Sequence, residues 1–123
     1  MISINKEENR KKGNSAEELA CEYLIQNDFS IIKRNFSFGK IGEIDIIAEK
    51  TNVLYFIEVR SKHSNSTYDP LISIDYNKQK KIRRSAEGYL YINKITDKEC
   101  RMDVIIVDLS GKANKINHIE NAF

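Results

Sequence analysis

Apolar residues along the chain follow two different spacings, and these spacings predict its helices and strands. From about Glu7 to Gln26 and from about Asp75 to Ile92 they recur every three or four residues, so both segments are predicted to be amphipathic helices. Runs rich in isoleucine, valine and aromatic residues predict β-strands at Phe29–Phe36, Ile44–Glu49, Val53–Arg60, Arg101–Leu109 and Lys115–Ile119. This order predicts a mixed sheet flanked by helices, in the α+β or α/β class.

Polar segments separate these elements, at Ser37–Gly42 and Ser61–Asp69, and a short polar break between two strands predicts a β-hairpin. If that turn has an even number of residues centred between Thr51 and Asn52, paired positions sum to 103 and Asp45 lies opposite Glu58. Directly opposed residues have Cβ atoms roughly 4.5–5.5 Å apart. A turn with an odd number of residues would shift the register by one.

Asp45 and Glu58 are charged residues inside apolar runs, Ile44-Asp45-Ile46-Ile47 and Phe56-Ile57-Glu58-Val59. Charges in such surroundings are costly unless they are paired or bound to a metal. Two adjacent carboxylates repel each other unless a cation lies between them, and Mg²⁺ suits this place because it takes one or two carboxylates and keeps several waters. The alternative is a pair of solvated acids on an open sheet face, paired with Arg60 or Lys62. Spacing alone does not decide between the two.

The size and composition of the chain narrow its class. A chain of 123 residues with 41% hydrophobic residues predicts one globular domain over residues 1–123. It has no apolar run of about eighteen residues and no apolar leader, so we expect no membrane span and a cytoplasmic location. Cys21 and Cys100 are far apart and form no CxxC pair, which argues against a zinc site and against a disulfide scaffold.

Charge adds a second candidate feature. The net charge of +2 excludes a uniformly basic domain, but it allows basic and acidic residues to occupy different surfaces. The segment Lys78–Arg84 carries five basic residues and no acid. Such a helix suits contact with a nucleic-acid backbone without readout of bases, although a charged run can also be only a solvated face. The residues predicted to bind nucleic acid are Lys62, Lys78, Lys80, Lys81 and Arg84.

The segment from Gly42 to Ala48, followed by Phe56-Ile57-Glu58-Val59-Arg60, resembles the YraN family. These are small bacterial proteins with a restriction-endonuclease-like core of the PD-(D/E)xK type, similar to archaeal Holliday junction resolvases. Further matches extend over nearly the whole chain: Gly13, Glu17, Ala20, Tyr23 and Leu24 in the first helix, Asn35 at the end of the first strand, Lys78 and Ala86 in the second helix, Arg101-Met102-Asp103-Val104 in the last core strand, and Ala122-Phe123.

The resemblance implies a metal-dependent endonuclease that cuts DNA phosphodiester bonds, in branched or damaged DNA, with Mg²⁺ or Mn²⁺. It implies that Asp45 and Glu58 hold the metal, with Glu43 either a third ligand or only an acid at the start of a strand. Arg60 stands where related cores carry a lysine. Because a guanidinium stays protonated, it can orient a phosphate but cannot act as a general base. The catalytic residues implied are Glu17, Asp45, Glu58 and Arg60.

Several alternatives stay open at this point. Arginine in place of lysine at position 60 is also compatible with a non-catalytic nucleic-acid-binding or scaffold module that kept the fold. Glu17 is also compatible with the role of an exposed acid near the start of a helix. Resolvase-like relatives act as symmetric dimers because two strands must be cut. A homodimer is therefore a further expectation here, although no sequence feature shows one. Asp103 is assigned to a structural ion pair with Arg101, and His118 to a structural role.

Overall fold

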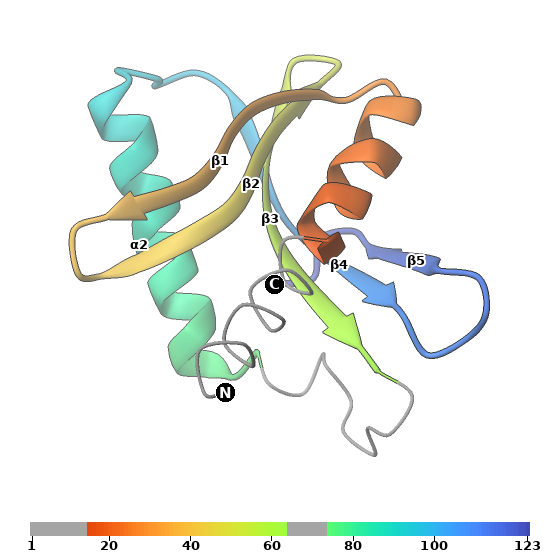
Figure 1. Ribbon diagram of the computed structural model, residues 1–123. Helices are drawn as coiled ribbons and strands as arrows, with labels where there is room; N and C mark the ends of the chain where they lie inside the picture. Colours follow the sequence, from red (N-terminus) through yellow and green to blue (C-terminus); the bar gives the residue numbers. More distant parts are fainter. Residues whose placement is uncertain (1–14, 64–73) are drawn as a thin grey trace.

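The computed structural model describes residues 15–63 and 74–123, and in this part a sheet carries one helix on each face (Figure 1). The described residues before Asn27 form the N-terminal helix, residues 15–26. The predicted part of that helix before Ser15, including Gly13, and most of the predicted loop at Ser61–Asp69 lie outside the described residues. The other elements are β1 (Ser30–Phe38), β2 (Gly42–Lys50), β3 (Val53–Lys62), α2 (Tyr76–Ile92), β4 (Glu99–Asp108) and β5 (Lys115–Ile119).

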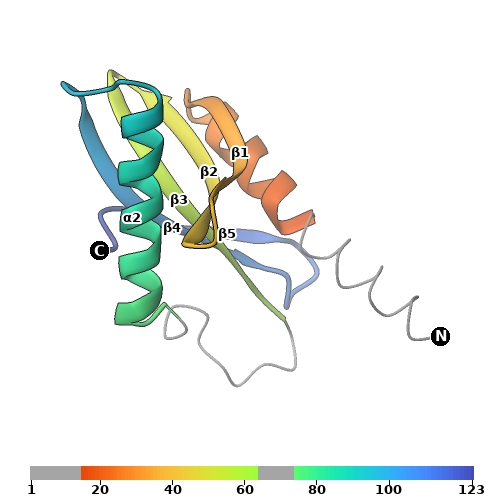
Figure 2. The ribbon, with the colours of Figure 1, turned by 90° about the vertical axis from the view of Figure 1, so that its left-hand side faces the viewer.

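The five strands of the described chain lie in the order β1-β2-β3-β4-β5. All neighbours are antiparallel except β3 and β4, which are parallel. A parallel pair needs a crossover connection, and α2 lies within it, packed on one face of the sheet (Figure 2). The predicted mixed α/β class is therefore confirmed. In the described residues no helix has both the length and the apolar character that a membrane crossing requires.

Two hydrophobic cores hold the helices on the sheet. The first lies under the N-terminal helix, where it buries Ala20, Leu24, Ile46, Ile57 and Ile105. The second lies under α2, where it buries Ile47, Phe56, Ile82, Ala86 and Tyr89. Because strand residues alternate between the two faces of the sheet, β2 and β3 contribute side chains to both cores. Their sequences are therefore nearly continuous apolar runs.

The β2–β3 hairpin has the register that an even turn predicts. Ile46 pairs with Ile57 and Lys50 pairs with Val53. Thr51 and Asn52 form the turn with φ of 50° and 64°, and two successive positive φ angles are typical of the two-residue turn that matches strand twist. The paired ladder ends at Ile46 and Ile57, one position before Asp45 and Glu58.

β2 changes its exposure pattern at Asp45. Ile44 packs in the core under α2, whereas Ile46, two residues later, packs in the core under the N-terminal helix. On the facing strand Asn35 has a φ of 53°, a left-handed conformation that asparagine tolerates better than most residues. Asn35 therefore lies inside β1 and not at its end, since β1 continues to Phe38. Asn35 lies between the Arg34–Ile46 and Phe36–Ile44 pairs, so it faces Asp45 where the alternation of β2 breaks.

Candidate active site

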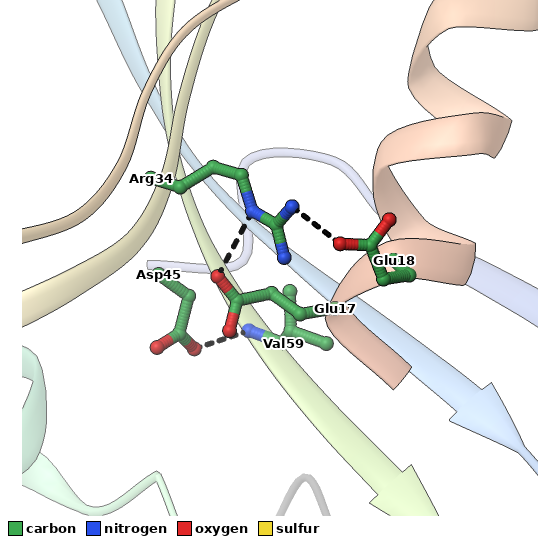
Figure 3. A network of polar contacts seen from close by, with 5 residues as sticks. All are labelled: Glu17, Glu18, Arg34, Asp45 and Val59. Carbon is green, nitrogen blue, oxygen red and sulfur yellow. Dashed lines mark hydrogen bonds and ion pairs between the residues drawn. The ribbon is translucent and has the colours of Figure 1, made fainter. Parts of the chain in front are cut away.

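Asp45 lies where β2 and β3 stop pairing. The backbone N–H of Val59 donates a hydrogen bond of 2.8 Å to Asp45 Oδ2 (Figure 3). The carboxylate thus accepts from a β3 amide just beyond the last backbone pair. Burial raises the pKa of Asp45, while the Val59 hydrogen bond and the charges of Lys78 and Arg60 oppose the rise. The side chain is fixed in position and its charge is costly to keep.

Glu58 is the second acid of the site and is only 5% exposed. Burial, followed by the neighbouring charge of Asp45, raises its pKa to about 7. The two carboxyl groups are close enough to share a hydrogen bond when one of them is protonated. The structure therefore brings together the two residues that the hairpin register placed opposite each other.

Two cations approach Glu58 from different elements. Arg60 Nε lies 3.5 Å from Glu58 Oε1, and Lys78 Nζ lies 3.9 Å from the same oxygen. Lys78 is held in the first turn of α2, since its backbone N–H donates 2.8 Å to the Asp75 side chain that caps the helix. Arg60 Nε is buried and makes no hydrogen bond with the described residues. A buried donor that has an ion-pair contact but no hydrogen bond suits an added anionic oxygen, such as one of a phosphate.

Glu17 reaches the site from the N-terminal helix, and its side chain is 12% exposed. Burial and the charge of Asp45 raise the pKa of Glu17, while Arg34 opposes the rise. Arg34 on β1 donates 3.4 Å to Glu17 and 2.7 Å to Glu18, so one guanidinium holds both helix acids (Figure 3). Sequence reasoning missed Arg34, because only the packing of the helix on the sheet brings it to the acids.

Glu43 is exposed and pairs in register with Ser37, and it makes no hydrogen bond or ion pair with Asp45 or Glu58. In residues 15–63 and 74–123, no group of three or more His, Cys, Asp or Glu side chains is arranged to hold a metal. The available donor set is the Asp45–Glu58 pair, with Glu17 nearby. Such a set fits Mg²⁺ or Mn²⁺, which keep waters as ligands, better than a cation that needs a full protein cage.

The predicted nucleic-acid-binding residues fall into three places. Lys78 lies against Glu58, in the acid site. Lys62 ends β3, in register with Asp108 of β4. The remaining three line a hollow of about 230 Å³ on α2 together with Asn77: they are Lys80, Lys81 and Arg84.

The predicted ion pair between Asp103 and Arg101 is wrong. Asp103 is fully buried and accepts from His118 Nε2 at 2.7 Å and from the backbone N–H of Asn121 at 3.0 Å. Arg101 instead lies over the ring of Tyr55 and pairs with Glu99 at 3.7 Å. The side chains of Arg101 and Asp103 point to the same face of the sheet. However, β5 pairs with β4 and places His118 closer to Asp103 than Arg101 is.

The fold and the site define a class: a mixed α/β domain, consistent with an α+β nuclease-like core, that holds one buried and one half-buried carboxylate where two antiparallel strands part. Residues 16–107 match the model described as Uncharacterised protein family UPF0102. The chain therefore belongs to the UPF0102 family, also called YraN, and the resemblance drawn from its sequence is confirmed.

Relatives match the chain over most of its length. A UPF0102 protein of Alkaliphilus oremlandii is 41% identical over 117 residues, which cover 94% of this chain and 99% of the relative. One of Helicobacter hepaticus is 42% identical over 110 residues, 89% of this chain and 94% of the relative. One of Persephonella marina is 42% identical over 112 residues, 91% of this chain and 92% of the relative.

Proposed function

We propose that this protein is a metal-dependent endonuclease that cuts phosphodiester bonds of DNA, with branched or damaged DNA as its substrate class. The observation that carries the proposal is the Asp45–Glu58 pair. Glu58 is buried and Asp45 is half-buried beside it, and the pKa of each is raised despite two nearby cations. Keeping such a pair charged is costly, and a divalent cation bound between the two groups would offset that cost.

Each residue of the site has a role in this proposal. Asp45 and Glu58 hold Mg²⁺ or Mn²⁺, and Glu17 supports the same site from the helix. When bound, the metal supplies a Lewis acid for the phosphate and lowers the pKa of a water. Arg60 directs its Nε, which has no hydrogen-bond partner among the described residues, to a phosphate oxygen, and Lys78 adds a second positive charge beside Glu58.

A second candidate function, a nucleic-acid-binding module without catalysis, has a specific observation in its favour. Arg60 occupies the place of the lysine in related cores, and the described residues offer no ready three-ligand metal cage. A guanidinium cannot take the proton of an attacking water. If this second function is correct, the acid pair has been retained with the fold but has no catalytic role, and the protein binds DNA without cutting it.

A cleavage assay separates the two functions. The protein is incubated with duplex, flap and four-way-junction DNA in the presence of Mg²⁺, Mn²⁺ or EDTA. We expect cutting with either metal and none with EDTA, because the carboxylate pair alone cannot activate a water. Binding of these DNAs without cutting under every metal condition would reject the endonuclease and support the binding module.

The basic hollow on α2 gives a separate prediction. The double variant Lys80→Glu with Arg84→Glu should weaken DNA binding roughly tenfold or more and lower the slope of log affinity against log salt by about two. The measurement is fluorescence anisotropy of labelled DNA at several salt concentrations. The matched control is Lys112→Glu in the β4–β5 turn, on the opposite side of the molecule from α2 (Figure 1). If the double variant behaves like this control, the hollow is not the DNA-binding surface.

A further inference from the structure

A cavity of about 330 Å³ lies between the N-terminal helix, the β2–β3 turn and β5. It contains none of the acid-site residues. Its helix residue Tyr23 is six positions after Glu17, which is roughly 9 Å along a helix axis. Small-molecule sites typically have volumes of about 300–1,000 Å³, so this cavity suits a ligand at the small end of that range.

One wall of the cavity is a buried polar chain. Tyr23 Oη and His118 Nδ1 share a hydrogen bond of 2.9 Å, and His118 Nε2 lies 2.7 Å from Asp103 Oδ2. Asp103 is fully buried, and the side chain of His118 is only 7% exposed. Burying a carboxylate is costly, and here it fixes the orientation of one imidazole. Tyr23 and His118 therefore present a rigid wall with both aromatic edges and polar atoms.

Two cations lie over aromatic rings in the same cavity. Lys50 Nζ is 5.0 Å from the centre of the Phe29 ring, and the Arg101 guanidinium is 6.0 Å from the centre of the Tyr55 ring. The centres of the Phe29 and Tyr55 rings are 4.9 Å apart in an edge-to-face arrangement, so the two cations lie over neighbouring rings. Lys50 forms no ion pair with a carboxylate of the described residues.

The charge balance of the lining favours an anion. Lys50 and Arg101 line the cavity with one acid, Glu120, so the lining is net positive, although Glu99, outside the lining, also pairs with Arg101 at 3.7 Å. A lysine ammonium and an arginine guanidinium that line one cavity suit the oxygens of a phosphate. The aromatic walls suit a planar ring, and the Asn27 amide and the Thr51 hydroxyl can hydrogen bond to the edge of a base. A nucleotide combines a phosphate with a planar base, so it matches both features of the lining.

We propose that this cavity binds a nucleotide, with the phosphate at Lys50 and Arg101 and the base against the Tyr23–His118 wall. The nucleotide is either free or an unpaired unit of a nucleic-acid strand, since both present the same chemistry. The site goes beyond the proposed endonuclease and does not depend on cleavage, because none of its residues belongs to the acid pair.

The test is an NMR titration of the ¹⁵N-labelled full chain with four probes: dTMP, thymidine, inorganic phosphate and a short oligothymidylate. We expect dTMP to shift the amide signals of Tyr23, Thr51 and His118 in a saturable way. Thymidine and phosphate should each bind roughly tenfold more weakly, since each keeps only half of the contacts. Saturation by dTMP alone assigns a free nucleotide, and saturation by the oligothymidylate as well assigns an unpaired unit of a strand.

The double variant Lys50→Met with Arg101→Met should lower dTMP affinity roughly tenfold, because it removes both charges and keeps two long apolar side chains over the rings. Lys40→Met in the β1–β2 turn is the control and should bind dTMP as the wild type does, since this exposed lysine does not line the cavity. Phosphate binding as tight as dTMP binding, an unchanged affinity of the double variant, or no shift at the three amides would each overturn the proposal. Variants of Asp45 or Glu58 should bind dTMP as the wild type does even if they no longer cut DNA, because neither residue lines this cavity.

Discussion

Replacing Asp45 by asparagine should reduce DNA cleavage about a thousandfold and leave the fold intact. The asparagine side-chain oxygen can still accept the Val59 N–H, so the point where β2 and β3 part keeps its hydrogen bond. The negative charge that would hold a divalent cation is lost. A loss of this order is typical when one preorganised charge-stabilising group is removed from a transition state. Cleavage rates and calorimetric titration with Mn²⁺ measure the two effects.

Asp97→Asn is the matched control, since it makes the same chemical change at an exposed residue outside the site. This variant should cut DNA and bind Mn²⁺ as the wild type does. Thermal unfolding of both variants checks that the folds are comparable. Wild-type cleavage by the Asp45 variant would sink the assignment of the acid pair.

Glu58 should make the protein less stable as pH rises. Its pKa is 4.5 in the unfolded chain and about 7 in the folded one, chiefly because of burial. Below pH 4.5 the group is protonated in both states. Between the two values the unfolded chain releases the proton and the folded chain retains it, so unfolding becomes more favourable as pH rises. The loss amounts to about 3 kcal/mol by pH 8, since each pKa unit corresponds to roughly 1.4 kcal/mol.

Glu58→Gln should abolish most of this loss. Glutamine keeps the size of the side chain without a titrating proton, although Asp45, Lys78 and Arg60 continue to face the same place. Urea unfolding between pH 4 and pH 8 should show the variant and the wild type converging at acid pH and the variant more stable at pH 8. Glu87→Gln, on the exposed face of α2, should follow the wild type throughout. A wild-type protein that gains stability relative to Glu58→Gln as pH rises would contradict the expected sign.

The part of the site that could be predicted from the sequence depends on local geometry. The turn at Thr51 and Asn52 sets the register of the β2–β3 hairpin, and that register places Asp45 beside Glu58. This register can be predicted because the turn is a short polar break between two apolar runs, and all of these residues are consecutive in the sequence. The sheet class follows in the same way, from the order of segments whose spacing is visible in the sequence.

The rest depends on contacts between segments that are distant in the chain. The Asp103–His118 pair exists because β5 packs beside β4 in one register, and five residues of an edge strand do not specify that register from sequence. Arg34 meets Glu17 only because the N-terminal helix crosses the sheet there. The break in alternation at Asp45 likewise occurs opposite Asn35, whose φ of 53° the sequence does not specify.

The hydrogen bond between Val59 and Asp45 has a consequence for comparing members of this family. At this position a side-chain acceptor serves the backbone of β3, so a chain without any catalytic activity would still benefit from an aspartate or asparagine there. Glu58 differs, because it accepts no backbone hydrogen bond in the described part of the chain, and its burial weakens the fold. Under the proposed endonuclease function, a carboxyl group at the Glu58 position is therefore the better mark of an active member, and an aspartate at position 45 alone is a mark of the fold.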